Sequence, residues 1–166
     1  MDQGITPERY RVIPRTLIFV LHRSRVLLLR RAKHKAVGPG LYNGVGGHIE
    51  PGEDVLSAAY RELREETGLT DVTLHLCGTA MVDVRPVGVL LFVFRGELPE
   101  DQTPALRPTT EGELTWIPIE RLGQHALVPD LYVLLPRVLE WRLSEPVFHA
   151  LITPQPDGQV RVRFGG

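Results

Sequence analysis

The sequence predicts a single α/β domain, and three observations support this fold class. The chain has 166 residues, enough for one domain with its own hydrophobic core. Its apolar runs are short and strand-sized, as in Thr16–Leu21, Val26–Leu29 and Val87–Phe94. Between these runs, residues 55–67 show the apolar spacing of an amphipathic helix. We therefore treat residues 1–166 as one domain.

Composition narrows the classes of function. The formal net charge is −1, so the sequence gives no general attraction to nucleic acid or to a membrane surface. Cys77 is the only cysteine, which excludes an internal disulfide and favours a reducing compartment. The N-terminal residues are polar, and no apolar run has the length of a membrane span. We expect a cytoplasmic protein that binds neither membranes nor nucleic acid.

The first half of the predicted sheet consists of two hairpins. Residues 1–13 are expected to form an arm, and Thr16–Leu21 pairs with Val26–Leu29 across a short polar loop. Val72–Val84, bent near its glycine, is expected to pair with Val87–Phe94 through a turn that contains a proline.

A basic cluster at residues 30–35 leads into a loop at residues 37–42. The cluster is either a solvated loop or a contact to a polyphosphate, because guanidinium and ammonium groups both suit phosphate oxygens. Arg31 and Lys33 are the candidate substrate-binding residues in this cluster.

The C-terminal part is expected to add a strand, a helix and a hairpin. Residues 111–118 read as a strand, and Leu131–Trp141 reads as a helix that Pro136 either starts or kinks. Residues 146–164 read as a hairpin, since proline and glycine form the turn between two apolar runs. This hairpin is expected either to extend the main sheet or to mediate self-association as a homodimer.

The predicted helix after Pro51 and Gly52 has recognisable ends. Asp54 is a suitable N-cap, because its carboxylate accepts hydrogen bonds from free backbone N–H groups. Gly68 suits the left-handed residue that ends a helix. The apolar residues expected on one side are Leu56, Ala59, Tyr60 and Leu63.

A neighbouring strip of this helix is acidic. Glu62, Glu65 and Glu66 are spaced i, i+3 and i+4, so their side chains share a face. Such a run is either a solvated acidic face or a metal site. Val55 and Ala58 lie on the same strip and indicate a partly covered groove. A groove of clustered carboxylates suits Mg²⁺, which prefers oxygen ligands and keeps waters for a phosphorylated substrate.

The segment Gly47–Leu69 resembles the signature box of the Nudix hydrolases. The fixed positions of that pattern are all filled, by Gly47, Glu53, Arg61, Glu62, Leu63, Glu65, Glu66, Gly68 and Leu69. The resemblance implies an α/β/α sandwich with a mixed sheet, to which the C-terminal hairpin is an extension. It also implies hydrolysis of a phosphoanhydride in a nucleoside diphosphate linked to another group, with Mg²⁺ or Mn²⁺.

The resemblance further implies roles for individual residues. Glu62, Glu65 and Glu66 would hold the metal, helped by a backbone carbonyl of Gly46 or Gly47, and one glutamate would act as the base. Glu53 and Arg61 would support them, since the arginine typically orients a glutamate. Glu111 resembles a distal glutamate that some members add to the site, and is otherwise a solvated loop acid.

A second, weaker resemblance concerns the substrate. Segments around Thr16, Asn43 and Asp130 are similar, in the same order, to oxidised-purine nucleoside triphosphatases of the MutT-like branch. There, residues at the positions of Asn43 and Asp130 recognise the base, because amide and carboxyl groups read a purine edge. Leu131 stands where the animal enzymes have a second acid. The resemblance therefore gives 8-oxo-dGTP as a candidate substrate and does not assign it. Asn43 is otherwise a turn residue, and Asp130 a helix N-cap.

Three functions are consistent with the sequence. The first is a nucleoside triphosphatase that sanitises the nucleotide pool. The second is a hydrolase of ADP-ribose, a nucleotide-sugar or a dinucleoside polyphosphate. The third is a Nudix module that only binds a nucleotide, and the intact glutamates argue against it.

Overall fold

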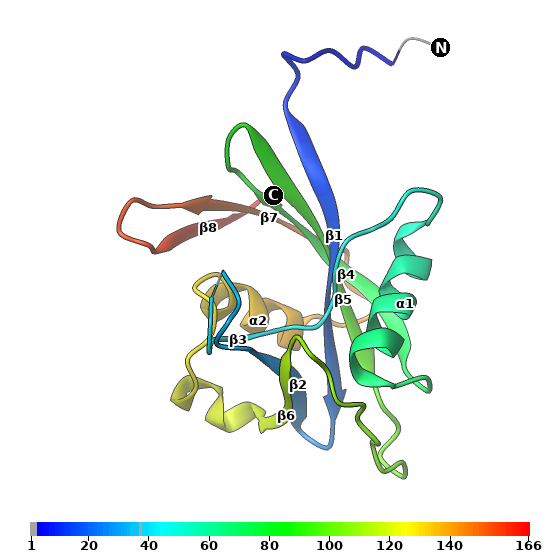
Figure 1. The fold of residues 1–166 in the computed structure, drawn as a ribbon. Coiled ribbons are helices and arrows are strands. Elements are labelled where there is room, and N and C mark those ends of the chain that lie inside the picture. The colour runs from blue at the N-terminus through cyan, green and yellow to red at the C-terminus, as the bar shows by residue number, and fades with distance from the viewer. Residues whose placement is uncertain (1–2, 37) are drawn as a thin grey trace.

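Eight strands form one mixed sheet within residues 3–36 and 38–166, the part of the chain that the computed structural model describes. The order is β3-β2-β1-β5-β4-β7-β8, and β6 pairs with β2. The elements are β1 (Arg11–His22), β2 (Arg25–Arg31), β3 (Tyr42–Asn43), α1 (Val55–Thr67), β4 (Thr73–Val82), β5 (Val87–Glu97), β6 (Gly112–Pro118), the 3-10 helix η1 (Ile119–Gln124), α2 (Leu131–Glu140), β7 (Phe148–Pro154) and β8 (Val160–Phe164). Helices α1 and α2 lie on opposite faces of the sheet, so the predicted α/β/α sandwich is confirmed (Figure 1).

Strand β1 supplies side chains to two hydrophobic cores. Leu17 and Phe19 pack in the core on the α2 side, whereas Ile18 and Val20 pack in the core on the α1 side. Successive side chains of a strand point to opposite faces, which explains why residues 17–21 of this strand are apolar at every position rather than at alternate ones. β1 pairs antiparallel with β2 and parallel with β5, so it occupies the middle of the sheet.

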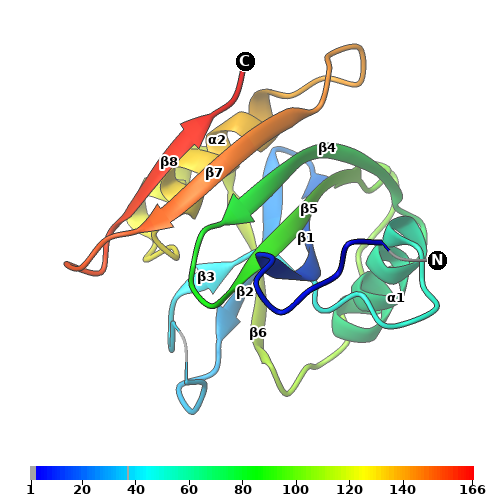
Figure 2. The same cartoon turned by 90° about the horizontal axis from the view of Figure 1, so that it is seen from above.

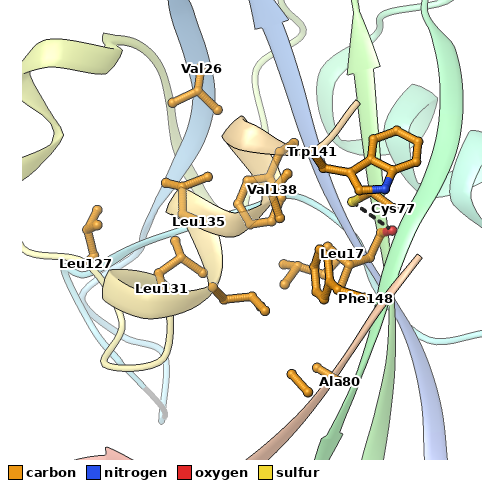
Figure 3. Packing of buried hydrophobic residues seen from close by; sticks show 14 of the residues in the cluster. Leu17, Val26, Cys77, Ala80, Leu127, Leu131, Leu135, Val138, Trp141 and Phe148 are labelled. Carbon is orange, nitrogen blue, oxygen red and sulfur yellow. Dashed lines mark hydrogen bonds between the residues drawn. The ribbon is translucent and has the colours of Figure 1, made fainter. Parts of the chain in front are cut away.

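Helix α2 packs on the sheet through one apolar side (Figure 3). Leu131, Leu135 and Val138 are buried, and they belong to the same core as Leu17 of β1. Pro136 lies inside the helix rather than at its start, and its side chain is exposed. The predicted helix is therefore confirmed, with its proline on the solvent side.

The C-terminal hairpin extends the main sheet beside α2 (Figure 2). β7 pairs parallel with β4, and β8 pairs antiparallel with β7. The first of the two predicted roles for this hairpin is thus confirmed, while self-association stays a prediction. Gly78 of β4 permits the contact with the hairpin, because a Cβ there would lie 2.3 Å from the ring of Phe148. A register shift between Leu76 and Gly78 marks the predicted bend.

Two predictions about local structure are wrong. The expected arm at residues 1–13 is shorter, because β1 already begins at Arg11 and its residues 11–13 pair with the start of β5. Pro14 and the charged residues near it are untypical of a strand, so the sequence does not indicate this extension. Residues 1 and 2 of the predicted arm lie outside the described residues. Leu56 does not face the core: it is 46% exposed, and α1 instead buries Ala58, Ala59, Leu63 and Thr67.

Within the described residues, no helix has both the length and the apolar character needed to cross a membrane.

Phe148→Ala should lower the free energy of unfolding by about 3 kcal/mol or more, because it removes a large buried ring from the core. The ring is 5% exposed and meets Phe164 edge-on at 5.8 Å between centroids. Urea denaturation followed by circular dichroism measures the change. Leu143→Ala is the control, since Leu143 is 68% exposed and should cost less than about 0.5 kcal/mol. Equal effects of both variants would contradict the view that the hairpin belongs to the core.

Candidate active site

Helix α1 is fixed at both ends by the predicted residues. The Asp54 carboxylate accepts a hydrogen bond from the Ser57 N–H at 2.9 Å, and Asp54 itself is extended. Gly68 is left-handed, with φ of 80°, and its N–H donates to the Arg64 carbonyl at 2.9 Å. These caps satisfy backbone groups that a helix end otherwise leaves free. They fix where the helix starts and stops, and hence where its acidic strip lies.

Arg61 connects this strip to the loop before the helix. Its Nη1 donates to the carboxylates of Glu62 at 2.9 Å and Glu65 at 3.1 Å. Its Nη2 donates to the Glu53 carboxylate at 2.9 Å and to the His48 carbonyl at 3.0 Å. The hydrogen bonds that Arg61 donates to Glu53 and Glu62 raise the pKa of Arg61 above its already high value. The guanidinium therefore stays charged and holds the three carboxylates in place.

The loop at Gly46 and Gly47 lies between β1 and α1. The Thr16 N–H donates to the Gly47 carbonyl at 2.8 Å, and the Gly47 N–H donates to the Thr16 hydroxyl at 3.2 Å. On the helix side, the Gly46 N–H donates to Glu66 at 2.8 Å. A Cβ on Gly47 would lie 2.5 Å from Glu62 Oε1, so any other residue here would displace the Glu62 carboxylate from its present position. Because the Gly47 carbonyl is already bonded, the Gly46 carbonyl is the better candidate for a metal.

Two adjoining cavities lie beside this loop. The larger, of about 410 Å³, is lined by Arg15, Gly46, Gly47, His48, Glu50, Glu62, Glu65, Glu66, Thr109, Thr110 and Glu111. The smaller, of about 140 Å³, is lined by Arg15, Thr16, Leu17, Leu29, Arg31, Asn43, Gly44, Val45, Gly46, Glu66, Leu91, Glu111 and Asp130. The residues common to both are Arg15, Gly46, Glu66 and Glu111. We call the first the carboxylate cavity and the second the inner cavity.

The carboxylate cavity carries concentrated negative charge. Burial raises the pKa of Glu66 to about 7, and the nearby charges of Glu62 and Glu111 act in the same direction. The Gly46 N–H and the charge of Arg15 oppose this rise. A carboxylate in such surroundings is stabilised by an added positive charge. The cavity is therefore suited to a cation.

The donor set of this cavity fits a hard divalent cation. Glu62, Glu65, Glu66 and Glu111 all line it and offer oxygen ligands, which Mg²⁺ and Mn²⁺ prefer. Within residues 3–36 and 38–166, however, no three or more His, Cys, Asp or Glu side chains already stand as a metal site. Glu62 and Glu65 bind Arg61, and Lys35 Nζ lies 2.6 Å from Glu111. The carboxylates would have to turn from these protein partners toward a metal.

Most of the predicted substrate residues gather at the inner cavity. Thr16, Arg31, Asn43 and Asp130 all line it, although they come from different parts of the chain. Lys33 does not: it lines another depression, at the end of β2 and the start of β6, to which Arg31 also contributes. The basic cluster is thus divided between two places, and Val37 of the predicted loop lies outside the described residues.

Asn43 and Asp130 differ in how they are held. The Asn43 side-chain oxygen accepts a hydrogen bond from the Gly44 N–H at 2.8 Å, so this residue both stabilises the turn and faces the cavity. Asp130 occupies the N-cap position of α2, but its side chain makes no capping hydrogen bond. Burial raises the pKa of this carboxyl group. The alternative interpretation of Asp130 as a helix N-cap is therefore wrong for its side chain.

Four of the cavity residues that were not predicted from the sequence matter most for the geometry of the site, and one ion pair was not predicted either. Arg15 lines both cavities, while Leu17, Leu29 and Leu91 supply the apolar walls of the inner one. Leu91 is the register partner of Arg15, so the pairing of β5 with β1 creates this wall. The ion pair joins Lys35 of the basic cluster to Glu111. An arginine directly before Thr16 was the signal in the sequence that could have revealed Arg15.

Comparison with known proteins identifies the family. The NUDIX domain family matches residues 12–138, which is most of the chain. The chain belongs to the NUDIX family. Among solved structures, a MutT protein from Bacillus halodurans has the same NUDIX fold, with a TM-score of 0.75 and 22% sequence identity. That alignment covers 92% of this chain and 97% of the other.

Curated relatives share shorter stretches with this NUDIX protein. An oxidized purine nucleoside triphosphate hydrolase of Danio rerio is 48% identical over 63 residues, which is 38% of this chain and 39% of the relative. An isopentenyl-diphosphate Delta-isomerase of Jannaschia sp. (strain CCS1) is 34% identical over 113 residues, 64% of each chain. The chain thus spans about two fifths of the first relative and less than two thirds of the second.

The ion pair between Arg61 and Glu53 should make the free energy of unfolding depend on pH in the acid range. A hydrogen bond from Arg61 lowers the pKa of Glu53 from its usual 4.5 to about 2. Because the pKa is lowered on folding, the stabilising contribution of Glu53 is complete above pH 4.5 and is lost as the pH falls toward 2.

We expect wild-type protein to need more urea than Glu53→Gln for unfolding at neutral pH. The difference between the two urea midpoints should stay constant from pH 7 to about 5 and shrink between pH 4.5 and 2. Because both proteins contain all the other carboxylates, the titration of those groups affects both urea midpoints alike and drops out of the difference. A difference that is the same at pH 7 and pH 2.5 would contradict the proposed pairing.

Proposed function

We propose that this NUDIX protein hydrolyses a phosphoanhydride bond in a nucleoside diphosphate linked to a further group. The leading substrate class is a nucleoside triphosphate, with an oxidised purine as the first base to test. The products would be a nucleoside monophosphate and pyrophosphate. Water would add to a phosphorus atom as the bond from that atom to the bridging oxygen breaks. A cytoplasmic location and a homodimer stay predictions from the sequence.

The observation that carries this proposal is the junction of two unlike cavities. The carboxylate cavity suits a metal and the phosphates that bind it, while the inner cavity combines apolar walls with a few polar groups. Leu17, Leu29 and Leu91 would contact the faces of a planar base, and Asn43 and Asp130 would meet its polar edge. A nucleotide likewise joins a planar base, with a polar edge, to a chain of charged phosphates. Its base would enter the inner cavity and its phosphates would lie among the glutamates.

The residues of the chain would divide the chemical work. Glu62, Glu65 and Glu66 would hold Mg²⁺ or Mn²⁺, joined by Glu111 and the Gly46 carbonyl. The bound metal would neutralise phosphate charge and lower the pKa of a water. Arg61 would keep Glu62 and Glu65 oriented, and Glu53 would anchor Arg61. One of the cavity glutamates would accept the proton of the attacking water.

Two other substrate classes need the same carboxylate cavity. ADP-ribose, nucleotide-sugars and dinucleoside polyphosphates also place two phosphates between a nucleoside and a further group. The isomerase relative indicates an isoprenyl diphosphate instead. The polar groups of Asn43, Asp130 and Arg31 argue against a purely apolar occupant of the inner cavity, because they would lose hydrogen bonds to water there. A NUDIX module that only binds nucleotides remains the non-catalytic alternative.

The test is a hydrolysis panel with Mg²⁺, using 8-oxo-dGTP, ordinary dNTPs, ADP-ribose, diadenosine polyphosphates and isopentenyl diphosphate. Product analysis by chromatography and phosphorus NMR distinguishes the substrate classes. Pyrophosphate with a monophosphate supports the triphosphatase. AMP with a sugar phosphate, or two adenosine nucleotides from a diadenosine polyphosphate, supports the second class, and isomerised isopentenyl diphosphate supports the third. Turnover of no compound would favour the binding module.

The same panel includes Glu65→Gln and Glu66→Gln. Each replaces a metal-binding carboxylate by an uncharged amide, so turnover should fall by about a hundredfold or more while the fold remains. Glu113→Gln is the control, since Glu113 is exposed on β6 and lines neither cavity. Hydrolysis at the wild-type rate by Glu65→Gln or Glu66→Gln would contradict the assignment of the metal site.

A further inference from the structure

Arg15 holds an unusual position in this site. It lines both the carboxylate cavity and the inner cavity, yet it belongs to β1 and lies outside the signature segment. Leu17 and Phe19, two and four residues further on, pack in the core on the α2 side. Because side chains alternate along a strand, Arg15 starts from that same face. Its long side chain reaches from there to the junction of the two cavities.

In the described part of the chain, the guanidinium of Arg15 has no protein partner. Throughout residues 3–36 and 38–166, it makes no hydrogen bond and no ion pair. Of the other cations at the site, Arg61 binds Glu53, Glu62 and Glu65, and Lys35 binds Glu111. Arg31, whose buried Nε has no hydrogen-bond partner among the described residues, lines the inner cavity but not the carboxylate cavity. Arg15 is also half-buried, so it is less screened by solvent than a surface arginine. A half-buried guanidinium without a partner is available to a ligand.

The charges around the junction indicate what that ligand group is. Of the residues that line both cavities, Glu66 and Glu111 are acidic and Gly46 has no side chain, so Arg15 supplies the positive charge. A phosphate that passed through the junction would otherwise face two carboxylates. Arginine suits this position, because its planar donors bind phosphate oxygens in pairs.

We propose that Arg15 binds the phosphate group attached to the nucleoside, where the substrate passes from the inner cavity to the carboxylate cavity. This inference rests on the proposed function, since it takes the inner cavity as the nucleoside site. It assigns to Arg15 a role separate from the metal: to hold the first phosphate and so set the position of the anhydride bond among the glutamates. Arg15 would thereby distinguish nucleotides from nucleosides even without a metal.

The experiment measures binding in the presence of EDTA, so that metal and turnover play no part. Isothermal titration compares three pairs of probes: guanosine with GMP, adenosine with AMP, and 8-oxo-deoxyguanosine with 8-oxo-dGMP. Wild-type protein should bind the monophosphate of its preferred pair more tightly than the nucleoside. Arg15→Gln should weaken binding of the monophosphate by about ten- to a hundredfold and leave the nucleoside unchanged. Arg15→Lys should fall between the two, because it keeps the charge but not the paired donors.

Arg11→Gln is the matched control: it lies on the same strand, is exposed and lines neither cavity. It should bind both members of the pair like the wild type. If Arg15→Gln weakens the nucleoside and the monophosphate equally, or weakens neither, the assignment of Arg15 is overturned and the nucleoside site stands. If wild-type protein binds none of the six probes, the nucleoside site fails, and the assignment fails with it. Thermal unfolding of each variant confirms that the proteins compared are folded.

Discussion

The guanidinium of Arg61 holds the site together. It joins the carbonyl of His48 and the carboxylate of Glu53, both before helix α1, to Glu62 and Glu65 on the helix itself. Without this cation, three carboxylates would repel one another, and the loop would lose its attachment to the helix. A charged group with several fixed donors can satisfy all these acceptors at once, which a single point charge cannot. The ion pairs thus explain how an acidic strip is kept in one conformation.

The sheet positions the site residues that do not belong to helix α1 or to the loop before it. β1 binds the Gly46–Gly47 loop through Thr16 and places Arg15 between the two cavities. β3 and the start of α2 then bring Asn43 and Asp130 to the inner cavity. The core around α2, which the C-terminal hairpin extends, sets the position of Asp130. The proposed substrate recognition therefore depends on packing far from the signature segment, whereas the proposed metal binding depends mainly on that segment.

The sequence predicted the local features well, because short-range geometry determines them. The ends of α1 follow from Asp54 and Gly68, and the shared face of the glutamates follows from the helical repeat. Long-range pairings were beyond reach. The parallel pairing of β1 with β5, which sets Leu91 beside Arg15, and the ion pair between Lys35 and Glu111 join segments far apart in the chain. The helical repeat also predicted wrongly that Leu56 faces the core: this apolar residue lies in the first turn of α1 and is exposed.

The affinity of Arg61→Lys for Mn²⁺ tests most directly whether Arg61 orients the glutamates for a metal. Lysine keeps the charge, but its single ammonium group cannot reach the same four partners, Glu53, Glu62, Glu65 and His48. If the account is correct, isothermal titration should show a loss of about ten- to a hundredfold in Mn²⁺ affinity, with circular dichroism unchanged. An Arg61→Lys protein that binds Mn²⁺ as tightly as the wild type would contradict it.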